Sequence, residues 1–221
     1  MTAKTGAERG GLRVWDLPVR LFHWTLLAGL AALYATQALG KMDLHARIGE
    51  AVLALVLFRL LWGVIGSQTA RFTDFVGGGR TVLAYLRQGR SPSAGHNPLG
   101  GWMIVALLGG LLLQAGLGLF SNDDILFEGP LAHLVSDGTS SLLTHWHVLL
   151  FKILAGLAAL HVAAVLAHWL GKGENLILPM LTGHKPWPAD RPRPALAFAP
   201  PLRALAMLAL AAAAVLLLIR L

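Results

Sequence analysis

Long runs of apolar residues, separated by short polar segments, make up most of the chain. A helix that crosses a bilayer needs roughly 18 to 20 apolar residues. Runs of this kind cover residues 21–39, 46–65, 100–120, 142–170 and 202–219. Because backbone polar groups find no partners in lipid, each run is predicted to be an α-helix. The pattern predicts an all-α integral membrane protein, with a four-helix bundle and a fifth, C-terminal transmembrane helix.

Proline, glycine and charged residues mark the boundaries between these runs. We expect an N-terminal segment over residues 1–20 and a four-helix core over residues 21–170. A proline-rich linker is predicted over residues 171–201, followed by the fifth helix over residues 202–221. The linker separates the fifth helix from the other four, so we expect this helix to be appended to the core.

Composition and charge support a membrane location. Hydrophobic residues make up 56% of the chain and charged residues only 13%, with a net charge of +7. Lys and Arg are concentrated before the first run, between the second and third, and after the fourth, whereas residues 121–141 contain none. The positive-inside rule therefore predicts a cytoplasmic N-terminus, a cytoplasmic linker and a periplasmic C-terminus. No nucleic-acid-binding motif accompanies the charge, so we expect no nucleic-acid partner.

The chain contains no cysteine. This excludes disulfides, covalent attachment of c-type haem and thiolate-ligated iron–sulfur clusters. Any metal chemistry in the membrane must therefore use histidine. Ionisable residues inside a membrane are costly and are usually functional, which makes the histidines of the apolar runs the first candidates.

Four of these histidines match in depth across different helices. His23 lies near the predicted cytoplasmic end of the first run, and His161 lies deep in the fourth run on the same side. His45 lies at the periplasmic start of the second run, at the level of His147 in the fourth. The depths therefore predict an inner pair, His23 and His161, and an outer pair, His45 and His147.

The spacing within the fourth run supports this choice of residues. His147 and His161 are 14 positions apart, which corresponds to a rise of about 21 Å and an angular difference of only about 40° around the helix. His145 points about 200° away from His147 and is the competing outer candidate, because a change of register in the first turn would exchange them. His168 shares the stripe but lies at the end of the run.

Two histidine pairs at two depths are what two stacked b-type haems require. Haem iron takes neutral imidazole as an axial ligand, and filling both axial positions leaves none open for oxygen. We therefore predict two haem b groups bound by these four histidines and used for electron transfer. Helix–helix hydrogen bonding is the alternative role for any single histidine. His96, His133 and His184 lie in loops and give no signal.

Two further charges fall inside the predicted spans. Arg59 is expected toward the cytoplasmic end of the second run, and Lys152 in the outer part of the fourth. Either could contact a haem propionate or the oxygen of a bound quinone. Both side chains are also long enough to reach the membrane surface.

Several segments together resemble the bacterial cytochrome b561 family, which includes the b-type subunits of membrane-bound nickel–iron hydrogenases. These are VWDLPVRLFHW, HARIGEAVLALVLFRLLWGVIGS, GHNPLGGW and HVLLFKILAGLAALHVAAVLAH, between residues 14 and 168. The resemblance implies a multi-pass protein of the bacterial cytoplasmic (inner) membrane. It also implies two b haems on the same four histidines, with electrons passing between a donor or acceptor at the outer face and membrane quinone. The acidic residues in the run 121–141 could dock a basic partner such as a periplasmic c-type cytochrome, and hydrogenase-like subunits are the other possible partners.

Three other functions compete with this interpretation. A superoxide:quinone oxidoreductase of the same family would need a cationic funnel at the outer face, for which Lys41, Arg47 and Lys152 are the candidates. A hydrogenase membrane subunit would use the same haem core. A haem-free divalent-metal carrier would use the histidines as transport ligands, but Glu50 is the only acid within a predicted span. The sequence leaves open whether the chain is itself an enzyme.

Overall fold

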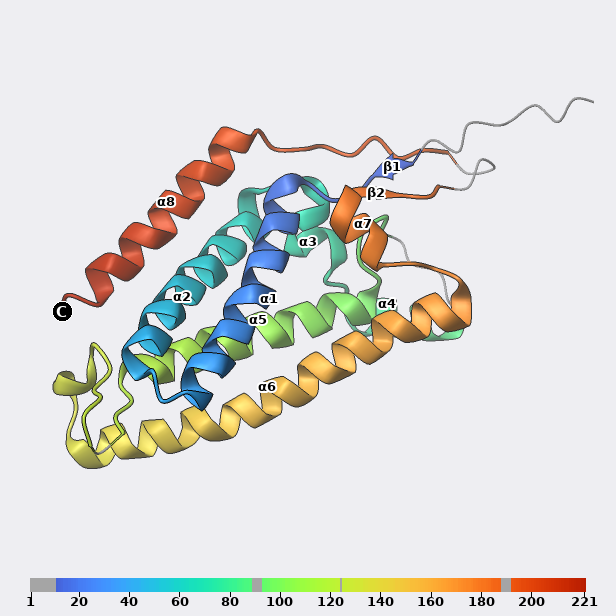
Figure 1. Ribbon diagram of the computed structural model, residues 1–221. Helices are drawn as coiled ribbons and strands as arrows, with labels where there is room; N and C mark the ends of the chain where they lie inside the picture. Colours follow the sequence, from blue (N-terminus) through green and yellow to red (C-terminus); the bar gives the residue numbers. More distant parts are fainter. Residues whose placement is uncertain (1–10, 89–92, 124, 188–191) are drawn as a thin grey trace, which may run out of the picture.

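The computed structural model describes residues 11–88, 93–123, 125–187 and 192–221. Long helices dominate it (Figure 1): α1 (Leu17–Ala38), α2 (Met42–Ile65), α5 (Pro98–Leu119), α6 (Asp137–Lys172) and α8 (Pro201–Leu218). All five are long and apolar enough to cross a membrane. The predicted class, an all-α membrane bundle with a fifth helix, is confirmed.

Shorter elements connect the long helices. They are β1 (Leu12–Arg13), η1 (Gln68–Ala70), α3 (Phe72–Phe75), α4 (Gly79–Gln88), η2 (Ala132–Leu134), α7 (Ile177–Thr182) and β2 (His184–Lys185). We call the end of the bundle at which α1 begins and α6 ends the inner end, and the opposite end the outer end. The charge pattern predicts that the inner end is cytoplasmic.

Polar capping residues set where three of the long helices begin. Asp16 accepts a hydrogen bond from the amide of Val19 at 2.8 Å, and Asn97 accepts one from Gly100 at 2.8 Å. Ser136 caps α6 in the same way. These caps satisfy amides that have no partner within the helix. The helices therefore begin several residues before the apolar runs, whose limits were defined by hydrophobicity alone.

Helix α2 is the most buried of the long helices, because α1, α5 and α8 all pack against it. Its Val56 and Trp62 are completely buried. Helix α6 packs along α5 and makes no extensive contact with α1 or α2. Helix α6, which carries His147 and His161, therefore packs mainly against α5.

The fifth helix is packed into the bundle rather than appended to it. Helix α8 lies along α2 (Figure 1), and its Ala204, Ala211 and Val215 are buried. Near the outer end, Val215 joins Leu119 and Leu131 in a hydrophobic cluster. Small side chains on α8 allow this close approach.

The segment predicted as a linker is fastened to the inner end. It contains α7 and β2, and β2 pairs with β1 in an antiparallel ladder with Leu12 opposite Lys185. Further along, the amide of Gln68 donates to the carbonyl of Ala197 at 2.9 Å, and the amide of Ala199 donates to Ser67 Oγ at 3.0 Å. The segment between α6 and α8 therefore covers the inner end instead of hanging free.

Asp16 joins α1 to α2 and should contribute strongly to stability. The residue is 3% exposed, and its second carboxylate oxygen accepts a hydrogen bond from Trp62 Nε1 at 2.9 Å. Asp16→Ala removes the cap and leaves a buried indole N–H unpaired, so we expect a loss of about 2–4 kcal/mol. Thermal unfolding in detergent, followed by circular dichroism, measures this loss. The control Asp137→Ala removes an exposed acid from the first turn of α6; equal effects of the two substitutions would contradict this role of Asp16.

Candidate functional site

The structure brings the predicted outer pair together. His45 lies in the first turn of α2 and His147 in the outer third of α6, and their ring centres are 6.3 Å apart. Both side chains are half-buried. They come from helices that do not pack extensively on each other, so the contact between the two rings is not a by-product of close helix packing.

Each outer imidazole is anchored by a third or fourth helix. His45 Nδ1 lies 3.0 Å from the carbonyl oxygen of Leu33 in α1, and His147 Nδ1 lies 2.9 Å from that of Gln114 in α5. A carbonyl oxygen can only accept, so each Nδ1 carries a hydrogen, and in the neutral form of each ring the lone pair is on Nε2. This is the arrangement by which proteins orient metal-binding histidines.

The backbone beside His147 leaves no room for a larger residue. A Cβ added at Gly118 of α5 would lie 3.0 Å from Cε1 of the His147 ring. On the same helix, Gln114 has a buried Oε1 without a hydrogen-bond partner among the described residues. Helix α5 thus restricts the position of His147 in two ways. The carbonyl oxygen of Gln114 bonds to its Nδ1, and Gly118 has no side chain that would displace the ring.

The inner pair is placed on α1 and α6. His23 and His161 are half-buried and lie within electrostatic reach of each other. His23 Nδ1 is buried and has no hydrogen-bond partner among the described residues. A buried polar nitrogen without a partner is costly and indicates a missing ligand or hydrogen-bonding group. As with the outer pair, α1 and α6 make no extensive contact.

The two other histidines of α6 lie outside these pairs. His145 is exposed, and its only ring contact among the described residues is the edge of Trp146, with centres 6.2 Å apart. His168, at the inner end, lies 3.4 Å from the hydroxyl of Tyr85 and bonds through Nδ1 to the carbonyl of Ala164. The structure therefore groups His147, not His145, with His45.

Arg59 and Lys152 differ sharply in their surroundings. Arg59 is 3% exposed, and its guanidinium lies 5.3 Å from the ring centre of Phe72. Its Nη1 is buried and has no hydrogen-bond partner in the described part of the chain. Lys152 is exposed on α6. Only Arg59 is enclosed by the bundle.

His96 is a residue of the inner end that the sequence analysis did not identify. It precedes α5, with its ring 4.4 Å from Trp15 and 5.0 Å from Phe75 between ring centres. Burial, followed by the nearby cationic group of Arg59 and the charges of His161 and His23, lowers the pKa of His96 to about 3. The segment GHNPLGGW offered the one available signal, since Asn97 as a cap and Pro98 in the first turn place His96 at a helix start.

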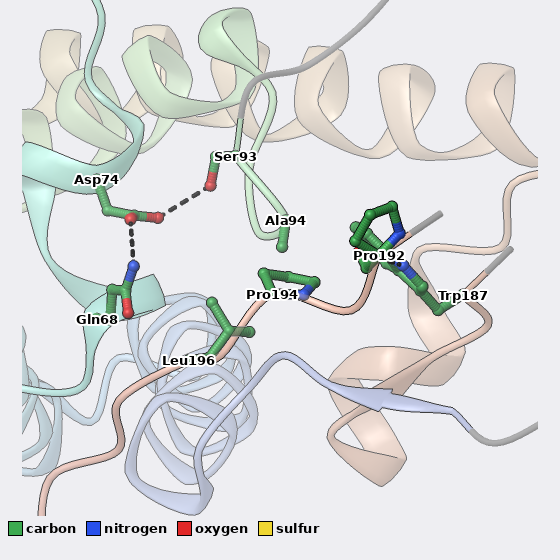
Figure 2. Close-up of a pocket in the computed structure, with 8 residues that line it drawn as sticks. All are labelled: Gln68, Asp74, Ser93, Ala94, Trp187, Pro192, Pro194 and Leu196. Atoms are coloured by element: carbon green, nitrogen blue, oxygen red, sulfur yellow. Dashed lines mark hydrogen bonds between the residues drawn. The ribbon is translucent and has the colours of Figure 1, made fainter. Parts of the chain in front are cut away.

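A polar cavity also opens at the inner end, away from the histidine pairs. It has a volume of about 270 Å³, and Asp74 lies at one side, accepting hydrogen bonds from Ser93 and Gln68 (Figure 2). Its lining comprises Gln68, Asp74, Ser93, Ala94, Trp187, Pro192, Pro194 and Leu196. None of the four paired histidines lines it, so it is not the site that they form.

The two imidazoles of the outer pair have the spacing that two ligands of one haem iron would need. With metal–nitrogen bonds of about 2 Å and roughly 1 Å from each nitrogen to its ring centre, an iron between two imidazoles separates the ring centres by about 6 Å. The outer pair has 6.3 Å. The described residues contain no cluster of three or more His, Cys, Asp or Glu side chains suited to a bare metal ion. Pairs without a third donor suit a metal whose other ligands come from a macrocycle.

Membrane-spanning helices with such histidine pairs between them define a membrane-bound b-type cytochrome. The family model of the prokaryotic cytochrome b561 matches residues 14–183, and the chain belongs to this family. The protein is thus a multi-pass membrane protein whose family transfers electrons across the membrane with b-type haem. The match ends before α8. No curated protein and no solved structure matches the chain.

If His45 and His147 hold a haem, called the outer haem below, Gly118 should be required for its binding. Gly118→Val places a branched side chain against the His147 ring, and such overpacking costs about 1–3 kcal/mol. We expect the variant to lose the outer haem preferentially, measured as haem per chain by the pyridine haemochrome assay. Gly116→Val is the matched control, because a Cβ at that position meets no atom within 4 Å. Full haem content in the Gly118 variant would show that the ring can move without losing its ligand function.

Proposed function

We propose that the chain conducts electrons across the membrane through two b haems, between a redox partner at the outer face and membrane quinone. His45 and His147 would hold the outer haem, and His23 and His161 the inner one. The observation that carries this proposal is the outer pair: two imidazoles, each anchored through Nδ1, with ring centres 6.3 Å apart.

The protein residues set the conditions for this transfer. A haem iron with two imidazole ligands changes its oxidation state without an open position for oxygen. The carbonyls of Leu33 and Gln114 orient the outer rings and make them better donors. Both pairs are half-buried among apolar helices. Electron transfer, rather than oxygen chemistry, is what this donor set favours.

The orientation in the membrane follows from charge. Lys and Arg gather at the inner end, and the outer connection between α5 and α6 contains only acidic charges. This supports a protein of the bacterial cytoplasmic membrane, with the N-terminus in the cytoplasm and the C-terminus in the periplasm. The outer haem would then face periplasmic donors or acceptors, and the inner haem would face the cytoplasmic side.

The outer connection is a suitable surface for the redox partner. Asp123 Oδ1 accepts hydrogen bonds from the amides of Ile125, Leu126 and Phe127, and these bonds lower the pKa of the exposed Asp123 carboxyl group. The acidic side chains Asp123, Glu128 and Asp137 are exposed. A basic periplasmic c-type cytochrome or a hydrogenase-like subunit would complement this charge.

The two other charged residues inside the spans, Arg59 and Lys152, have different support as cofactor contacts. Arg59 is buried at the inner end and can contact a haem propionate or a quinone oxygen there. Lys152 is exposed, and its role as such a contact is supported only by its position in the span. A superoxide:quinone activity would use Lys41, Arg47 and Lys152, which are all exposed. Metal transport has less support, because the paired histidines lack a third donor within the described residues.

The first test is the haem content of the purified protein. We expect two b haems per chain by pyridine haemochrome, both reduced by dithionite and both nearly insensitive to carbon monoxide, because neither iron has an open position. The measurements are the reduced-minus-oxidised spectrum and its change on adding carbon monoxide. A colourless protein that cannot be reconstituted would refute the proposed function, and a strong carbon monoxide response would refute ligation by two histidines.

Single substitutions assign each haem to its pair. His161→Ala should remove the inner haem and spare the outer one, and His45→Ala should do the reverse, because each removes one of two axial ligands. His145→Ala is the matched control for His147→Ala, since His145 is exposed. Haem content and separate redox titrations of the remaining haem measure the outcome. Loss of the outer haem in His145→Ala, with retention in His147→Ala, would exchange the two residues.

A further inference from the structure

The inner end contains a buried cation, Arg59, that forms no salt bridge with any of the described residues. Arg59 is 3% exposed, and its Nη1 has no hydrogen-bond partner among the described residues. Asp16 acts on it electrostatically, but its two oxygens already accept hydrogen bonds from Val19 and Trp62. A buried charge without a hydrogen-bonded counter-ion is strongly unfavourable. The surroundings of Arg59 therefore require an anion from outside the described chain.

A series of aromatic ring contacts connects Arg59 to His96. The guanidinium lies over Phe72, whose ring centre is 5.8 Å from that of Phe75. Phe75 in turn contacts His96, and Trp15 lies on another side of the His96 ring. Aromatic faces stabilise a nearby guanidinium but cannot neutralise its charge. These aromatic rings pack against Arg59 and His96 but do not compensate the positive charge of Arg59.

The groups that act electrostatically on His96 are all basic. They are Arg59, His161, His23 and Lys185. Because the pKa of His96 is lowered to about 3, this ring is neutral near pH 7 and adds no charge of its own. The region between Arg59 and the inner histidine pair thus combines one permanent positive charge with the neutral imidazole of His96.

We propose that Arg59 and His96 form the binding site for a carboxylate group of the inner haem. Arg59 supplies the positive charge, and His96 supplies a neutral polar ring at the start of α5. A carboxylate is favoured over a quinone oxygen, because a neutral carbonyl would leave the buried guanidinium without a counter-charge. The proposal rests on the proposed function, in which His23 and His161 hold that haem.

Blocking the haem carboxylates tests the site directly. The full-length chain carrying His45→Ala, which keeps only the inner haem, is prepared without haem and titrated with haem b or with its dimethyl ester. Hydrogen bonds to charged groups are worth enough to expect roughly ten- to a hundredfold tighter binding of the free acid. Adding Arg59→Met should reduce this ratio to near one, Arg59→Lys should preserve most of it, and His96→Phe should lower it.

Arg87→Met is the matched control, because it removes an exposed cation from α4 and should leave the ratio unchanged. A ratio near one with Arg59 present, or an unchanged ratio in Arg59→Met, would overturn the proposed site. Failure of the His45→Ala chain to bind either compound would instead refute the assignment of the inner haem, so the two proposals fail in different ways. If Arg59→Met does not fold, the ratio measured with Arg59 present still decides.

A redox titration of the intact protein provides a second readout that a purely structural role would not change. Replacing Arg59 by Met removes a positive charge near the inner iron and should lower the midpoint potential of the inner haem alone. Arg59→Lys should restore it, and Arg87→Met should change neither potential. Equal shifts of both haems, or no shift, would contradict a direct interaction between Arg59 and the inner haem.

Discussion

A histidine ring inside a membrane bundle is stable only when both of its nitrogens have partners, and this constraint organises the structure. In the outer pair, neighbouring helices satisfy one nitrogen of each ring through the carbonyls of Leu33 and Gln114. The second nitrogen then needs a ligand. Helices α2 and α5 pack against each other, whereas α6 makes no extensive contact with α1 or α2. Both histidine pairs lie across these less tightly packed boundaries.

The sequence predicted the five helices and the grouping of His45 with His147 because both depend on regular helix geometry. Rise per residue sets depth, and the angle between residues distinguishes His147 from the exposed His145. The same geometry could not predict where the helices begin. Those positions depend on single polar caps such as Asp16 and Ser136, which lie outside the apolar runs.

Contacts between distant segments were beyond the reach of periodicity. His96 was assigned no role, because helix geometry predicts neither the membrane depth nor the orientation of a loop residue. In the structure it lies beside Trp15 and Phe75. The predicted linker is fastened by bonds to residues more than a hundred positions away, such as Ala199 to Ser67. Likewise, the packing of α8 on α2 depends on matching small side chains, which no local pattern reveals.

If both histidine pairs hold a haem, as proposed, they offer the same donor atoms, so only their surroundings can set different potentials. At the outer pair, carbonyl oxygens bonded to Nδ1 strengthen the imidazole donors, which favours the oxidised metal. At the inner pair, His23 Nδ1 has no such partner within the described residues, and the buried Arg59 is near. A positive charge favours the reduced metal. Under the proposed function, both differences act in the same direction and favour electron movement from the outer end to the inner end.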